Sequence, residues 1–324
     1  MFEWLASPIW GGISALVAIA GMVSTLVYRT WKRKKLLGTK AKTNIQAPPP
    51  SEAYALVNRV VSTFKAHGIE RIQIPRFLGE ESGITIAHMG DDEKLLHAFS
   101  EKVLNDICFR FGIARDWLDG KDCPIYPRRF YDKDLKGFID FLEKIRADHD
   151  EVQCYVVKSE KDTLRKDGGD LTIAFVLRGK LCDWGEHQYE AIWRYYPLND
   201  TLYWGYERTR VQIKAMVLAA WQFGIHVQGR TASEDDVNAL VEGEVFPGIL
   251  LEATRGRIWQ PDAYIFADGE SCLVEDGAEA LAVRKEMERL GWMEYLTKKT
   301  GQLRIPNNGF KPIANICAIP GLEP

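Results

Sequence analysis

The strongest hydrophobic pattern in the chain is an uninterrupted apolar run near its N-terminus. Residues 9–28, IWGGISALVAIAGMVSTLVY, are twenty residues without a charged side chain. A helix that rises about 1.5 Å per residue would cross the hydrocarbon core of a bilayer, about 30 Å thick, over such a length. The pattern therefore predicts a single N-terminal transmembrane helix.

A basic cluster follows the apolar run and gives the expected topology. Its members closest to the run are Arg29, Lys32, Arg33, Lys34 and Lys35, and no acid lies among them. Because positive charge is retained on the cytoplasmic side, residues 1–8 are expected outside and the remainder in the cytoplasm. A signal peptide would carry its basic residues before the run. We expect a single-pass protein of a bacterial inner membrane, with the lipid bilayer as partner; small residues in the span also allow a homodimer.

Polar caps and helical spacing of apolar residues predict a small all-α domain over residues 51–122, after a basic and Pro-rich linker at 29–50. Its expected elements are a long helix after Ser51, a short helix at Ile74–Glu81, a helix after Asp91, a helix from Ser100 to Gly112 and a closing turn. The closing stretch, FGIARDWLDG, combines glycine stops with apolar residues that pack back onto the helices.

Residues 53–120 resemble a degenerate lambda-repressor-like (XRE-type) helix-turn-helix domain, with FGIARDWLDG as the most specific part of the resemblance. In that family the third helix reads DNA, which implies contacts from the stretch Gly83–Glu93 and makes Thr85 and His88 the candidates. The stretch departs from the family pattern because it has no Arg, Lys, Asn or Gln and ends in three acids. Base readout relies on such side chains, so the resemblance argues for the fold more than for DNA as a partner.

Residues 123–324 have a mixed pattern that predicts an α+β domain with a mainly antiparallel sheet. The expected order is a helix at 133–148, strands at 152–158, 171–179 and 189–198, a helix at 206–224, a strand at 225–230 and a helix at 233–244. The remainder from 246 is mixed, with a helix at 278–291. This order suits a sensory α+β module.

Charge and composition narrow the function classes. The chain has 42 Lys and Arg against 45 Asp and Glu. Because a cluster of the basic residues lies directly after the apolar run, the remainder of the chain, which we call the body, is acidic. A protein that binds duplex DNA usually presents a basic face. The six cysteines form no CxxC pair, and no phosphate-binding or zinc-protease motif occurs, so we predict neither a metal nor a cofactor.

One catalytic alternative comes from the order of elements, which resembles the core of the PD-(D/E)xK nucleases. Two carboxylates hold Mg²⁺ in that family, and the resemblance implies Asp170 and Glu190 for them. The sequence departs from the family at Ile192, where a lysine is expected. A diverged metal-dependent nuclease is therefore an alternative to a protein without catalysis.

A dense set of aromatic and basic residues gives the candidate binding surface: Trp184, His187, Tyr203, Trp204, Arg208 and Arg210. Such residues line pockets and protein interfaces, although they also fill cores. The leading prediction is a membrane-anchored cytoplasmic regulatory or partner-binding protein with a non-catalytic sensory α+β domain and a protein partner. The alternatives are a membrane-tethered DNA-binding transcriptional regulator and the diverged nuclease.

Overall fold

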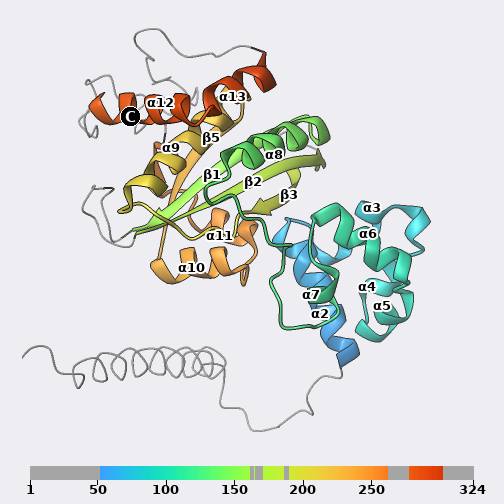
Figure 1. Ribbon diagram of the computed structural model, residues 1–324. Helices are drawn as coiled ribbons and strands as arrows, with labels where there is room; N and C mark the ends of the chain where they lie inside the picture. Colours follow the sequence, from blue (N-terminus) through green and yellow to red (C-terminus); the bar gives the residue numbers. More distant parts are fainter. Residues whose placement is uncertain (1–51, 161–163, 165–170, 186–189, 262–276, 302–324) are drawn as a thin grey trace, which may run out of the picture. The chain divides into compact units, whose positions relative to one another are not determined.

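Helices supply the regular structure between residues 52 and 118 of the computed structural model, which describes residues 52–160, 164, 171–185, 190–261 and 277–301 (Figure 1). They are α2 (Glu52–Ala66), η1 (Arg71–Gln73), α3 (Ile74–Leu78), η2 (Glu80–Ser82), α4 (Ile86–Met89), α5 (Asp92–Ala98), α6 (Glu101–Phe111) and α7 (Arg115–Leu118). We refer to residues 52–118 as the helical part.

The ends of α6 show why this sequence forms helices here. The Ser100 hydroxyl accepts a hydrogen bond from the Val103 amide at 3.3 Å and so caps the first turn. At the other end Gly112 adopts a left-handed conformation, with a φ of 71°, that a residue with a side chain rarely tolerates. The helix expected between Ser100 and Gly112 is confirmed.

The α+β part is built on a sheet whose strand order is β3-β2-β1-β5-β6, with β4 paired to β2 (Figure 1). Its strands are β1 (Val152–Ser159), β2 (Thr172–Asp183), β3 (Ala191–Pro197), β4 (Leu202–Tyr203), β5 (His226–Ala232) and β6 (Ile258–Trp259). Its helices are α8 (Leu135–Asp148), α9 (Glu207–Gln222), α10 (Glu234–Glu242), α11 (Pro247–Ala253), α12 (Gly277–Arg289) and α13 (Trp292–Thr300).

The sheet is mixed, which corrects the expectation of a mainly antiparallel sheet. The strands β1, β2 and β3 form an antiparallel meander, but β5 runs parallel to β1. The chain reaches β5 through α9, and a helical crossover of this kind returns the next strand in the original direction. The parallel pair lies in the middle of the strand order, between the meander and β6.

Two hydrophobic cores lie on the two faces of the sheet. The first contains residues of α8, α9, α12 and α13 with one set of strand residues, among them Phe138, Phe175 and Met216. The second contains the opposite set of strand residues together with α10, α11 and the helical part, among them Phe64 and Phe111. The helical part therefore shares a core with the sheet and has no separate one.

The expectation of a single transmembrane helix is corrected. Among the described residues no helix combines the length and the apolar character that crossing a membrane requires. The helix α9 is extensively buried, but its buried residues include Arg210 and Lys214, and its apolar residues pack in a core of the protein. The run at 9–28 and the basic cluster lie outside the described residues. The expectation of an inner-membrane location depended on the transmembrane helix and is corrected together with it.

His67 lies where the helical part, α11 and β3 meet. Its ring centroid is 4.2 Å from that of Phe111, 5.3 Å from that of Tyr195 and 6.2 Å from that of Phe246. Its Nδ1 donates to the Thr63 carbonyl at 2.7 Å. Burial lowers the pKa of His67 to about 4, because the charged ring would be cut off from water.

Gly248, at the start of α11, allows this helix to pack closely against α2 and β3. A Cβ there would overlap the carbonyl oxygen of Ala66 and lie 2.9 Å from the hydroxyl of Tyr195. We predict that Gly248→Ala lowers the free energy of unfolding by about 1–3 kcal/mol, because α11 must then move away from α2 and β3. Gly256→Ala is the control, since no atom lies within 4 Å of its Cβ position. Equal denaturation midpoints for the two variants would contradict this account.

We also predict that acid removes stability through His67. The unfolded ring takes up a proton near pH 6.5, whereas the folded ring, with its pKa lowered to about 4, stays neutral until lower pH. The stability advantage of wild type over His67→Gln should therefore shrink as pH falls, by about 2 kcal/mol between pH 7.5 and pH 5. Urea denaturation of both proteins at the two pH values measures it. A pH-independent difference would show that His67 is not buried in neutral form.

Candidate anion-binding site

The structure separates the aromatic residues that the sequence grouped as one binding surface. Trp184 is buried in the core shared with the helical part, where the guanidinium of Arg76 lies 4.5 Å from its ring centroid. Trp204 is buried in the core on the other face of the sheet. The two side chains are thus on opposite faces and do not line a common surface.

The other members of that group are dispersed as well. Tyr203 and Arg208 are exposed, whereas Arg210 is buried and donates to the Trp204 carbonyl at 3.0 Å. His187 lies outside the described residues. Arg210 therefore holds the end of β4, and the described members of this group do not meet at an open site.

Of the two acids implied by the nuclease resemblance, the structure describes one. Glu190 is exposed just before β3, and its carbonyl accepts from the Trp184 amide at 2.7 Å. Asp170 lies outside the described residues, so the pair stays a prediction. Within the described ranges, no three His, Cys, Asp or Glu side chains are close enough together to hold a metal ion.

The residues implied for DNA contact are engaged within their own turn. Thr85 precedes the four-residue helix α4, and its amide donates to Nδ1 of His88 at 3.0 Å. Between them Ile86 is 66 % exposed. The capping interaction occupies Nδ1 of His88, and Ile86, which lies between the two, is apolar and cannot read a base edge by hydrogen bonding. DNA contact at these residues stays a prediction.

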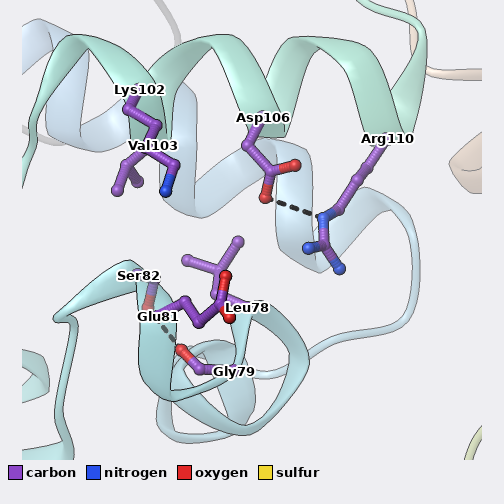
Figure 2. Close-up of a pocket in the computed structure, with 8 residues that line it drawn as sticks. All are labelled: Leu78, Gly79, Glu81, Ser82, Lys102, Val103, Asp106 and Arg110. Atoms are coloured by element: carbon purple, nitrogen blue, oxygen red, sulfur yellow. Dashed lines mark hydrogen bonds and ion pairs between the residues drawn. The ribbon is translucent and has the colours of Figure 1, made fainter.

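The helical part contains a pocket between α6 and the turn after α3 (Figure 2). Two of its charged residues on α6 neutralise each other, since Arg110 pairs with Asp106 at 2.8 Å. Arg110 also donates to the Phe77 carbonyl at 3.4 Å, and the Ser82 hydroxyl donates to the Gly79 carbonyl at 2.7 Å. Arg110, Asp106 and Ser82 are thus already engaged within the protein, and the other charged lining residues, Glu81 and Lys102, are exposed.

A different pair of arginines meets on the α8 side of β3, and we call Arg129 and Arg194 the arginine pair. Arg129 lies between α7 and α8, and Arg194 lies on β3. Both guanidinium carbons are 5.3 Å from the ring centroid of Tyr196. Arg129 is also 5.8 Å from the centroid of Phe141 on α8. Two cations are therefore gathered around one aromatic ring.

The helical part also contacts Arg194. The guanidinium carbon is 5.5 Å from the ring centroid of Phe109, which is 72 % exposed at the end of α6. A Cβ on Gly112 would lie 2.8 Å from Nε of Arg194, so the glycine that ends α6 also makes room for this side chain. That Nε is buried and has no hydrogen-bond partner among the described residues.

The ring at the centre is held by His149. Nδ1 of His149 is 3.0 Å from the Lys180 carbonyl, to which it must donate, and in the neutral ring Nε2 then accepts from the Tyr196 hydroxyl at 2.6 Å. Burial raises the pKa of Tyr196, and Arg194 and Arg129 act in the opposite direction. The hydroxyl thus stays protonated near neutral pH and its hydrogen bond fixes the ring.

The electrostatics of the arginine pair are unfavourable without a counterion. Burial lowers the pKa of Arg129, and the charge of Arg194 acts in the same direction, whereas tyrosines oppose it. Throughout the described ranges no carboxylate lies within ion-pair distance of either guanidinium. Nη1 of Arg129 donates to the Pro127 carbonyl at 3.1 Å, and the N–H bonds of the stacked guanidiniums that remain match the oxygens of phosphate and carboxylate groups. The arrangement is suited to binding an anion.

Part of this site had a signal in the sequence. The alternation in WRYY places Arg194 and Tyr196 on one face of β3 and Trp193 and Tyr195 on the other. Arg129 had none, because it reaches Tyr196 across a distance of 67 positions that no periodicity describes. Comparison with protein-family models, with curated proteins and with solved structures found no match.

We predict that the hydroxyl of Tyr196 stabilises the site through His149. Tyr196→Phe leaves Nε2 of His149 without its donor at a largely buried position, which should lower the free energy of unfolding by about 1–3 kcal/mol. Tyr203→Phe is the matched control, because Tyr203 is exposed. Chemical denaturation measures both, and an effect of Tyr196→Phe no larger than that of the control would refute the proposed hydrogen bond.

Proposed function

We propose that this protein is a regulatory protein whose α+β part senses a phosphate-bearing ligand at the arginine pair. The single observation that carries the proposal is that Arg129 and Arg194 surround the ring of Tyr196 with no carboxylate at ion-pair distance in the described part of the chain. An anion that enters this site would supply the missing charge.

A phosphate group fits this site better than a single carboxylate does. A phosphate monoester carries between one and two negative charges at neutral pH and three acceptor oxygens, so it can satisfy more than one guanidinium. The exposed ring of Phe109 beside Arg194 offers apolar contact to the group that carries the phosphate. The acidic balance of the body opposes nonspecific attraction of polyanions, which favours a local site over a long nucleic-acid track.

The location of the site supports a regulatory role. Phe109 and Gly112 belong to the helical part, and Arg194 and Tyr196 belong to the sheet. A ligand in contact with Arg194 and Phe109 would therefore touch both, and its binding energy would favour the arrangement in which they are packed together. A protein partner that reads this arrangement is part of the proposal. Transcriptional regulation through DNA and metal-dependent nuclease activity stay predictions that no described contact favours.

We predict that phenyl phosphate raises the unfolding temperature of the full-length protein and that Arg194→Gln and Arg129→Gln each weaken this binding about 10–100-fold. A hydrogen bond to a charged group is worth about 1.5–3 kcal/mol, which corresponds to such a factor. Thermal unfolding in a phenyl phosphate titration, at constant ionic strength, gives the affinities.

The control and the stability of the variants separate function from structure. Arg146→Gln removes an exposed arginine on α8 and should leave binding unchanged. Without ligand, Arg194→Gln should be at least as stable as wild type, because the repulsion with Arg129 is relieved. If Arg194→Gln unfolds at lower temperature and phenyl phosphate protects wild type and variant equally, the arginine pair is structural and the proposal fails.

A further inference from the structure

A second group of polar and aromatic side chains projects from the other face of the sheet. We call it the arginine face, and its members are Gln153, Tyr155, Arg178, Trp193, Gln228 and Arg230. They come from four strands, and the register places Gln153 beside Arg178 and Tyr155 beside Gln228. Since Trp193 and Arg194 are consecutive residues of β3, the arginine face and the arginine pair lie on opposite faces of that strand.

Arg178 is held with one of its donor edges already used. Its Nε and Nη2 atoms both donate to Oε1 of Gln153, at 3.1 and 2.6 Å. Its guanidinium carbon lies 4.0 Å from the ring centroid of Trp193, which fixes the plane of the group. A guanidinium has five N–H bonds, and besides Gln153 the Tyr195 hydroxyl also accepts from this one. The N–H bonds that remain on the Nη atoms form the end-on fork, which matches the two oxygens of a carboxylate.

The surroundings of Arg178 strengthen this preorganisation. The Tyr155 hydroxyl donates to the same oxygen of Gln153 at 3.0 Å, and Glu151 accepts from Nε2 of Gln153 at 2.7 Å. The amide is thus clamped with its oxygen toward Arg178. The one acid in this network is bonded to the amide, so it does not occupy the fork.

Arg230 adds a second cation on the far side of Tyr155. The guanidinium carbons of Arg178 and Arg230 lie 5.0 and 5.2 Å from the ring centroid of Tyr155. Arg230 is 7 % exposed, donates to Gln228 and to the Gly229 carbonyl, and has a buried Nε with no partner in the described chain. In those residues neither arginine forms an ion pair, so the positive charge of the face is not neutralised.

We infer that the arginine face is a binding site for the carboxylate of a small organic acid, with the end-on fork of Arg178 as its anchor. The planar fork and the single half-buried guanidinium suit one carboxylate, and the charge of Arg230 attracts the same ligand. Trp193 and the amide of Gln228 flank the position and would contact the body of the acid. This site is separate from the arginine pair, and the inference does not rest on the proposed function.

The test uses the full-length protein, with succinate, benzoate and inorganic phosphate as probes in isothermal titration calorimetry. We expect succinate or benzoate to bind, and Arg178→Lys to weaken that binding at least tenfold, because lysine keeps the charge and lacks the fork. Arg146→Gln, which removes an exposed arginine on α8 outside both sites, should leave carboxylate binding unchanged. Carboxylate binding that survives Arg178→Lys, or no binding of either acid to wild type, would overturn the inference.

A second variant guards against misfolding of Arg178→Lys. Gln153→Glu is nearly isosteric and places an anion on Nε and Nη2 of Arg178. Combined with Glu151→Gln, which replaces the carboxylate that Nε2 of Gln153 contacts at 2.7 Å, it should keep the unfolding temperature and still reduce carboxylate affinity at least tenfold, because the charge of Arg178 is then neutralised internally. Unchanged affinity in this folded variant would refute the site. If inorganic phosphate bound wild type as tightly as succinate and lost affinity in both variants, the carboxylate assignment would be wrong.

Discussion

The packing of His67 against Phe111 and Tyr195 is the contact on which the rest of the molecule depends. It joins the end of α2, the end of α6 and the strand β3 in one apolar core, which a charged imidazole would disrupt. Because Phe111 is fixed there, the residues beside it on α6 are fixed as well. Phe109 and Gly112 can therefore contact Arg194 across the junction, which ties the position of Arg194 to that of His67.

The strand β3 then carries the consequences to both faces of the sheet. Its even-numbered residues Arg194 and Tyr196 face α8 and the arginine pair, and its odd-numbered residues Trp193 and Tyr195 face the arginine face and the core around His67. A strand that is covered on both faces is normally apolar throughout. Here the departures from that rule are arginines stacked on aromatic rings, and they mark both proposed sites.

The sequence contained the local features of this fold and few of the non-local ones. The helix from Ser100 to Gly112 was predictable because its cap and its stop lie within the segment itself. The parallel pairing of β1 with β5 was not, since it depends on how α9 packs across the sheet. Trp184 and Trp204 are close in sequence and were grouped together, but they enter different cores. The transmembrane helix expected at 9–28 has no counterpart in the described residues.

Stacking on aromatic rings explains how the protein tolerates arginines without carboxylate partners. A cation over such a ring gains about 0.5–2 kcal/mol, which offsets part of the cost of burial but leaves the charge itself in place. An internal carboxylate would neutralise the charge and also occupy the N–H edges. With Tyr196 behind Arg194 and Trp193 behind Arg178, the faces of the guanidiniums are covered and edges are left open. An incoming anion can therefore bind such a guanidinium without first breaking an ion pair.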